Sequence, residues 1–244
     1  MRSARRLVQL GFSALLLAGA LGGVALPTAA AAPSPAVATM PGYATPEDAV
    51  TAYLEAVKAA DIEGVLATAA IDEMAQGFDF VAQVDRLRVW MPNLPAPATD
   101  PFLTEMDRIQ LQSQLLSQTR GLVYGLLTDL DMQNPSVVQA DADWAKALVA
   151  QLDLSRLAGL EIGPIADPAA ELSNSQKVAD SFAKQAAIYG ADELVERVAT
   201  IGLDGKAYQV GFGLIRYGDT WKVTYQVSNL AGMPATGAPL PVGE

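Results

Sequence analysis

Apolar residues recur at helical spacing over most of the chain before residue 190. The first such segment starts at Thr45, whose side chain suits a helix N-cap, and Pro46 fits the first helical position. The residues that keep the i, i+3, i+4, i+7 spacing of one helix face are Val50, Tyr53, Leu54 and Val57. We therefore expect an amphipathic helix that begins here and buries this face.

Further helices are expected between this segment and residue 190. Asp61 and Asp141 suit the N-caps of two of them, and periodic segments cover residues 62–70, 79–90, 101–129 and 173–189. The long segment 101–129 is rich in glutamine, so much of it should face water or a polar cleft. The Pro-rich stretch 91–101 ends the helix before it. Residues 155–168 hold too much Gly and Pro for a helix and should include a short strand.

After Gly190 the period of the pattern changes from helical to alternating. Strands are expected over residues 193–201, 208–217 and 221–228, with turns at Asp204-Gly205 and Gly218-Asp219. Apolar and polar residues alternate in the last strand, which indicates one covered and one wet face. Gly211 and Gly213 share a face of the middle strand, where a helix or a ligand could approach the backbone.

This order of elements predicts an α+β fold, in which helices come first and a C-terminal antiparallel β-meander wraps a helix. We expect a single domain over residues 45–230. A flexible Pro- and Ala-rich linker should precede it at 33–44, and a disordered tail should follow at 231–244.

Residues 1–32 have the layout of an exported leader. Three arginines precede an apolar stretch from Leu10 to Leu26, and small residues follow at 29–32. The alternative is an uncleaved membrane anchor, although glycines interrupt the apolar part. Arg5-Arg6 leaves the choice between Sec and Tat export open. We expect the mature protein to be secreted or extracytoplasmic, with no stable membrane insertion once the leader is removed.

Two stretches resemble a known family. Residues 45–69, TPEDAVTAYLEAVKAADIEGVLATA, resemble the opening helices of exported NTF2-like (cystatin-like, cone-shaped α+β) domains. Residues 205–230, GKAYQVGFGLIRYGDTWKVTYQVSNL, are similar to their closing hairpin. The segment of about 78–165 departs from the family pattern and reads as a helical insertion. The resemblance implies a cone fold. The function that the resemblance implies is divided. Some members are enzymes that use a carboxylate and a tyrosine inside the cone, and others are non-catalytic binding or assembly domains. No catalytic motif of those enzymes matches this sequence position by position.

Composition removes several kinds of function. The chain of 244 residues contains no histidine and no cysteine, so Ser-His-Asp and Cys-His triads cannot form and zinc or copper lacks its preferred ligands. Loss of the three leader arginines would change the net charge from -11 to -14. Such a surface repels phosphate, so we expect no nucleic-acid partner. We also expect no metal, because the preferred ligands of zinc and copper are missing, and no cofactor.

Carboxylate candidates are few and each has a simpler explanation. Asp79 and Asp85 lie close in sequence to aromatic residues and are the pair that could serve general acid–base work, although a solvated helix face explains them better. The oxygen-rich stretch 129–134 could bind a hard cation, but it lacks the glycine and the distant glutamate of an EF-hand loop. A helix end and a turn explain it better.

Aromatic residues are the candidate ligand-binding set, because Tyr and Trp combine apolar area with a polar tip. The set that could line the mouth of a cone is Tyr53, Trp90, Tyr124, Tyr208, Tyr217 and Tyr225, and ordinary core packing is the alternative. No residue is assigned a catalytic role.

Three functional hypotheses follow. The first is a secreted, non-catalytic binding or interaction module of the bacterial cell envelope, with a small molecule or an envelope protein as its partner. The second is a metal-independent isomerase or hydrolase that uses an Asp/Tyr pair in the cone. The third is a structural or assembly role, in which the long helix at 101–129 packs on another protein. The oligomeric state stays open.

Overall fold

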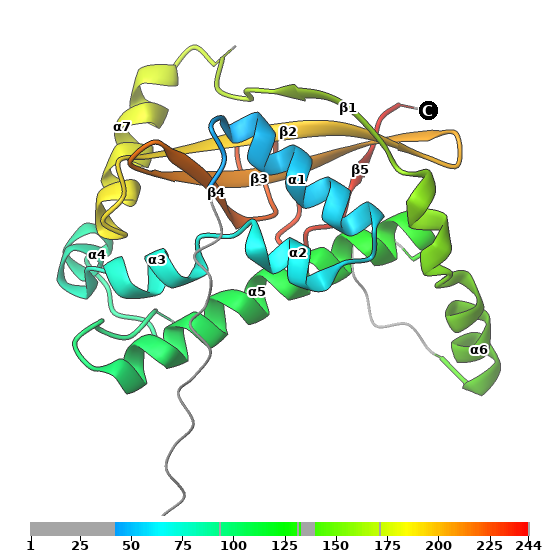
Figure 1. The fold of residues 1–244 in the computed structure, drawn as a ribbon, viewed down its shortest axis with the longest axis horizontal. Coiled ribbons are helices and arrows are strands. Elements are labelled where there is room, and N and C mark those ends of the chain that lie inside the picture. The colour runs from blue at the N-terminus through cyan, green and yellow to red at the C-terminus, as the bar shows by residue number, and fades with distance from the viewer. Residues whose placement is uncertain (1–41, 93, 131, 133–139, 171, 244) are drawn as a thin grey trace, which may run out of the picture. The chain divides into compact units, whose positions relative to one another are not determined.

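The computed structural model describes residues 42–92, 94–130, 132, 140–170 and 172–243. The predicted leader (1–32) and most of the predicted linker (33–44) lie outside the described residues. The described elements form an α+β fold, as the sequence predicts, with helices arranged around one antiparallel sheet (Figure 1).

The N-terminal helices begin where their caps predict. Helix α1 (Pro46–Lys58) follows Thr45, whose side chain accepts a hydrogen bond from the Asp48 N–H. Helix α2 (Ile62–Ala67) is capped by the Asp61 carboxylate. It is shorter than predicted because residues 68–70 bond to the backbone of Val223 in the sheet instead of continuing the helix.

Two short helices follow. Helix α3 (Ile71–Gly77) is absent from the sequence prediction. Helix α4 (Phe80–Leu87) is capped by Asp79 and ends before residue 90 because Arg88 takes a left-handed conformation, with φ of 55°.

The longest element is helix α5 (Pro101–Leu127), which starts after the Asp100 cap. It is followed by helix α6 (Ala142–Gln151), a 3-10 turn (Leu154–Gly159) and helix α7 (Ser175–Ile188). The expected strand within 155–168 is β1 (Glu161–Ala166). The described part of 78–165 is therefore mainly helical.

The sheet has the strand order β1-β2-β3-β4 and is antiparallel throughout the described pairs. Strands β2 (Glu193–Leu203) and β3 (Lys206–Tyr217) form a hairpin in which Asp204 and Gly205 have φ values of 51° and 75°. These are the positive values that a two-residue type I′ turn requires. Strand β4 (Thr220–Tyr225) continues the meander, and β5 (Leu240–Pro241) pairs with the far half of β3.

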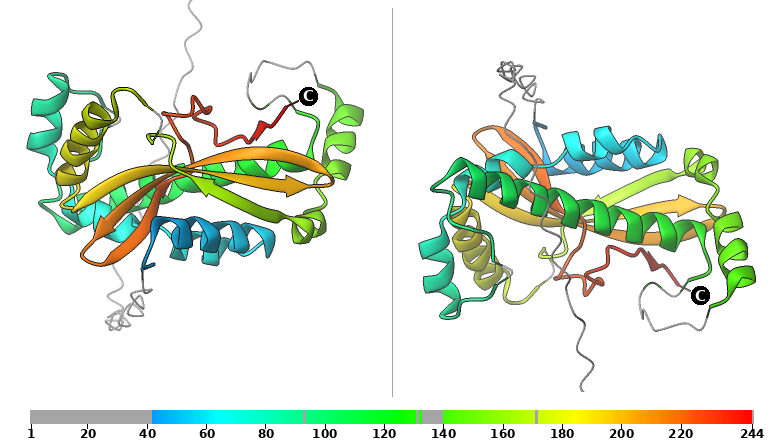
Figure 2. Two further views of the ribbon diagram at one scale, coloured as in Figure 1. Left: turned by 90° about the horizontal axis from the view of Figure 1, so that it is seen from above. Right: turned by 90° about the horizontal axis from the view of Figure 1, so that it is seen from below.

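The sheet is covered on both faces. Helix α1 lies on one face, and α7 and the C-terminal segment lie on the other (Figure 2). The main core lies between the sheet and α1 and includes Tyr53, Leu54, Phe212 and Leu214, all fully buried. Leu115 and Leu122 join α5 to this core. This face is therefore filled by side chains.

The prediction of a disordered tail was wrong for the described residues 231–243. Met233 and Ala238 are buried, and residues 240–241 add a strand to the sheet. The segment lies directly on α5, where a Cβ at Gly121 would overlap the Thr236 carbonyl oxygen. The sequence did not predict this ordered segment, because it has neither a helical nor an alternating period. Its packing also depends on small residues elsewhere in the chain.

The predicted close approach to Gly211 and Gly213 is present, and the chain itself makes it. A Cβ at Gly213 would overlap the ring of Tyr225, and one at Gly211 would overlap Ser228 and Met233. The two glycines thus let Tyr225 and the segment after β4 lie flat on the sheet.

Candidate functional site

A cavity of about 300 Å³ lies on the sheet face opposite α1, between that face and helices α3, α5 and α7. We call it the amide pocket. Its described lining residues are Met74, Leu111, Gln114, Gln118, Gln185, Tyr189, Leu194, Thr224, Tyr225, Val227, Asn229 and Ala235. None of these is acidic or basic, so its polar groups are amides, phenols and a hydroxyl.

The polar walls come from three elements. Gln114 and Gln118 are one helical turn apart on α5, so they project from the same side of that helix. Gln185 and Tyr189 have the same spacing at the end of α7. Tyr225 is the last residue of β4, and Asn229 lies in the loop after that strand.

Gln118 and Thr224 contribute differently to the pocket. The Gln118 side-chain oxygen accepts a hydrogen bond from the Gln226 N–H at 2.9 Å, which fixes this amide against the sheet. The Thr224 hydroxyl is buried and has no hydrogen-bond partner among the described residues.

A buried carboxylate lies behind the Tyr225 phenol. Glu196 is 2% exposed and accepts hydrogen bonds from the Ser228 hydroxyl at 2.7 Å, the Leu230 N–H at 3.0 Å and the Tyr225 hydroxyl at 3.3 Å. Glu196 is not one of the residues that line the amide pocket. Its charge therefore fixes the loop after β4 and orients the phenol.

The two phenols of the pocket are neutral at physiological pH. Burial raises the pKa of Tyr225, and the neighbouring Glu196 charge raises that pKa further. Burial also raises the pKa of Tyr189. A catalytic tyrosine base needs a pKa lowered toward the working pH, so the shift of Tyr225 is in the opposite direction. The phenols can act as hydrogen-bond donors and as apolar walls.

Of the six aromatic residues predicted to bind a ligand, the structure brings Tyr225 to the amide pocket. Tyr217 lies beside it, and its hydroxyl donates to the Tyr189 carbonyl at 3.1 Å. Tyr53 and Tyr208 lie in the core under α1, where the Tyr53 hydroxyl is 2.7 Å from that of Thr119.

The other two predicted aromatic residues lie on separate parts of the surface. Trp90 is 62% exposed beside α4. Tyr124 lines a different depression, along α5. The six aromatic side chains are therefore not gathered around one cavity.

Sequence reasoning missed most of the pocket. The polar face of the long helix was a signal for Gln114 and Gln118, since it predicts water or a polar cleft there. No periodic signal distinguishes Gln185, Tyr189 or Asn229, because they come from a helix end and a loop that only the tertiary fold brings together.

The carboxylates considered from sequence have structural partners. Asp79 caps α4 through the Ala82 N–H at 2.9 Å, and Asp85 forms an exposed ion pair with Arg88 at 2.8 Å. No group of three metal-ligating side chains is found among the described residues. Asp131 and Asn134 of the cation candidate lie outside them.

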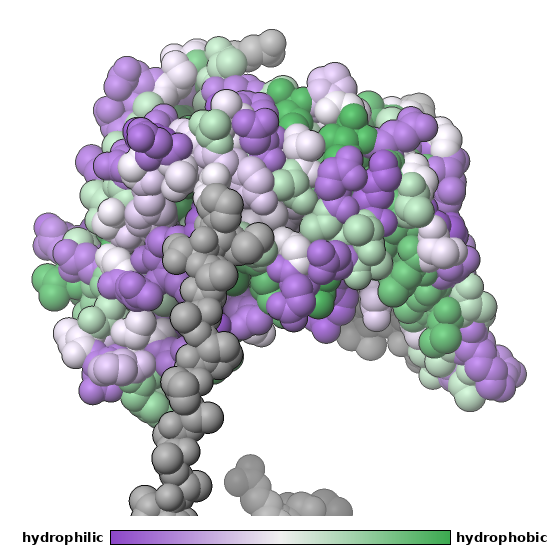
Figure 3. Space-filling model, in the orientation of Figure 1, coloured by the Kyte–Doolittle hydropathy of each residue, from purple (hydrophilic) through white to green (hydrophobic). Residues whose placement is uncertain are grey.

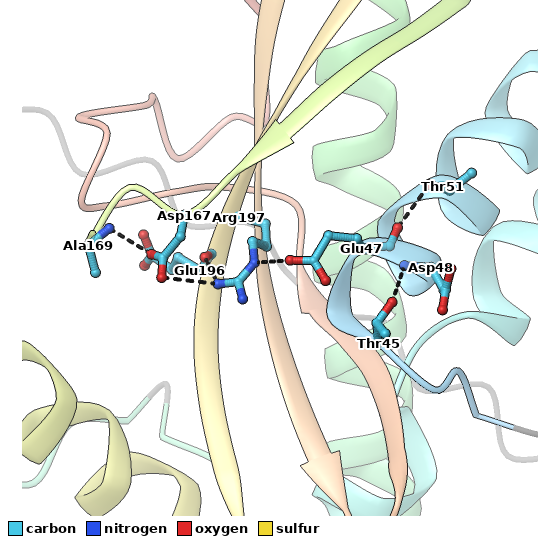
Figure 4. Close-up of polar contacts among 8 residues, drawn as sticks. All are labelled: Thr45, Glu47, Asp48, Thr51, Asp167, Ala169, Glu196 and Arg197. Carbon is cyan, nitrogen blue, oxygen red and sulfur yellow. Dashed lines mark hydrogen bonds and ion pairs between the residues drawn. The ribbon is translucent and has the colours of Figure 1, made fainter. Parts of the chain in front are cut away.

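A second polar cluster lies on the α1 side of the sheet, and ion pairs between its own side chains hold it together (Figure 4). Arg197 on β2 is 2.6 Å from the Glu47 carboxylate at the start of α1 and 3.7 Å from that of Asp167, which follows β1. Its guanidinium also donates to the Glu196 carbonyl at 2.9 Å. Because the arginine contacts an acidic side chain from each of two elements, this cluster joins α1 and the end of β1 to the sheet, and its role is structural.

The surface that carries α1 is mixed in hydropathy. On the part of this face drawn in colour, hydrophilic residues are widely spread and hydrophobic ones form small groups (Figure 3). Among the described helices, none is long and apolar enough to cross a lipid bilayer.

Comparison with known proteins gives one structural neighbour. No protein-family model and no curated protein matches the chain. Among solved structures, the chain is similar to a cystatin-like protein from Ruminococcus gnavus ATCC 29149, with 19% identity and a TM-score of 0.49. The match covers 81% of this chain and 44% of that protein, so the chain spans less than half of its length. The α+β assignment rests on the helices and sheet described above.

Proposed function

We propose that this protein is a secreted, non-catalytic binding module of the bacterial cell envelope that holds a small uncharged molecule in the amide pocket. The observation that carries the proposal is the neutral lining of this cavity, with amides and phenols on several sides. The leader pattern of residues 1–32 supports export.

The lining favours a polyhydroxylated ligand such as a monosaccharide or disaccharide. Side-chain amides donate and accept hydrogen bonds at once, which suits neighbouring hydroxyl groups. Tyrosine rings supply an apolar surface for the face of a sugar ring. A charged ligand would lose its hydration without gaining an ion pair, because no lining side chain carries a charge.

An enzyme with a carboxylate and a tyrosine in the cone is the alternative, and Glu196 with Tyr225 is the pair that favours it. Two observations argue for binding instead. Glu196 already accepts three hydrogen bonds and does not line the cavity. The raised pKa of Tyr225 keeps its proton in place, so the pair lacks an accessible base at neutral pH.

The experiment is an NMR titration that follows the side-chain NH₂ signals of Gln114, Gln185 and Asn229. Methyl glucoside and N-acetylglucosamine serve as neutral probes, and glucuronate and glucosamine as charged ones. We expect the neutral probes to shift these signals and the charged probes to bind at least about tenfold more weakly, because desolvating a charge is costly. If no neutral probe shifts any of the three signals, the proposal is wrong.

Matched variants test the site and the alternative. Asn229→Leu should weaken probe binding about tenfold, whereas Gln209→Leu, an exposed amide on β3 that does not line the pocket, should leave it unchanged. The same spectra report conversion of the probe. Conversion that Glu196→Gln abolishes would establish the enzyme and overturn the binding role.

A further inference from the structure

The outer face of α5 carries an apolar stripe that no described element covers. Phe102, Met106 and Ile109 are 71%, 52% and 53% exposed. Their spacing of four and three residues places them on one side of the helix. Seen from below, α5 runs in front of the sheet with no other described element over it (Figure 2, right).

The second half of the same helix borders a depression. A hollow of about 700 Å³ lies along α5 next to α2, and its apolar lining residues are Ile62, Ile109, Leu116 and Val123. The first half of the face therefore presents protruding apolar side chains, and the second half presents a recess lined by similar ones.

We propose that this face is the interface between two copies of the chain, packed through antiparallel α5 helices about a two-fold axis between Gln112 and Ser113. A two-fold interface requires one surface patch to be complementary to itself. In this register Phe102 faces Val123 of the second copy and Ile109 faces Leu116, so each protruding half enters the other copy's recess. The two contacts are identical by symmetry.

Charge supports the same register. The axis that brings Phe102 to Val123 also brings Glu105 to Arg120 of the second copy. Glu105 is paired within its own helix to Arg108 at 2.7 Å, and Arg120 has no ion pair among the described residues. The Arg120 of each copy would then face the Glu105 carboxylate of the other copy, so the pair occurs once at each end of the interface.

The face is distinct from the amide pocket, although both use α5. The pocket takes Leu111, Gln114 and Gln118 from the inner side of the helix. The stripe residues lie on the opposite side and do not line that cavity. Self-association and ligand binding can therefore succeed or fail independently.

Sedimentation velocity of the purified protein between about 1 and 100 µM tests the proposal, because association depends on concentration. We expect twice the monomer mass at the upper end and a monomer for Ile109→Asp. Val149→Asp alters an apolar residue on α6 that is even more exposed, at 69%, and should remain dimeric. A monomeric parent protein, or an Ile109→Asp variant that remains dimeric, would overturn the proposal.

Charge reversal tests the register. Arg120→Glu and Glu105→Arg should each weaken the dimer about tenfold, and combining them should restore it, because the two charges exchange places across the axis. Additive losses in the double variant would overturn the antiparallel register. Each variant should keep the far-ultraviolet circular dichroism of the parent protein, since both side chains are exposed.

Discussion

At the residue scale, the two buried acidic side chains Glu196 and Asp107 differ in how their oxygens are satisfied. Glu196 is saturated with hydrogen bonds, so its charge serves the loop after β4. Asp107 on α5 is different, since it is 3% exposed and only partly satisfied. Its Oδ1 accepts a hydrogen bond from the Ala96 N–H at 2.8 Å. Its Oδ2 is buried without a partner among the described residues. The sequence offered no signal for either, because burial of a carboxylate is set by neighbours far along the chain.

Asp107 should make stability fall as pH rises. Burial raises the pKa of this carboxyl above its ordinary value of about 4, so the folded state binds more protons than the unfolded state between the two pKa values. The folded protein therefore loses stability as pH rises through this range. Asp107→Asn removes the effect, so the variant should gain stability relative to the parent protein as pH rises from about 4 through the raised pKa of Asp107 in the folded state.

Urea unfolding at a series of pH values measures this difference. Asp219→Asn, an exposed aspartate in the turn before β4, controls for the change in net charge. A relative stability of Asp107→Asn that falls toward neutral pH would contradict the prediction.

At the element scale, caps and periods predicted the helices and strands well. Thr45, Asp61, Asp79, Asp100 and Asp141 all act as N-caps. The errors occur where tertiary contacts compete with a local pattern. Helix α2 ends early because residues 68–70 bond to β4, and the C-terminal segment is ordered by contact with α5 and β3.

Gly121→Ala tests whether the C-terminal segment depends on α5. Alanine is the better helix former by about 1 kcal/mol, but its Cβ would overlap the Thr236 carbonyl oxygen. We expect a net loss of about 2 kcal/mol in the free energy of unfolding, because the segment has to shift. Chemical denaturation measures it.

Ser117→Ala is the matched control, because it lies one turn earlier on an exposed position of α5. It should change stability by less than about 0.5 kcal/mol. If Gly121→Ala is as stable as the parent protein, the segment does not rest on this helix.

At the scale of the whole molecule, the composition and the predicted leader bear on the role proposed above. The chain carries a net charge of -11 and contains no histidine or cysteine. A binding role outside the cytosol fits such a composition, because hydrogen bonds and shape need neither residue type. The proposed dimer would present two amide pockets from one assembly.

Export predicts a defined mature protein. Secreted material should lack residues 1–32 and begin at Pro33, which intact-mass spectrometry measures. Replacing Arg5 and Arg6 with lysine separates the two routes, because Tat export needs the arginine pair and Sec export does not. Full-length protein retained in the membrane fraction would favour the anchor alternative.

The sequence by itself determined the fold class, the caps of three helices (Thr45, Asp61 and Asp141), the strand meander and its turns, because these depend on spacing and local backbone preferences. It also excluded nucleophilic triads that need histidine or cysteine. Only the tertiary structure decided which sheet face is filled by side chains and which is hollow, and that Gln185, Tyr189 and Asn229 share one cavity with Tyr225. The reason is physical: a pocket is the space left between elements after they pack, and no local pattern records that space.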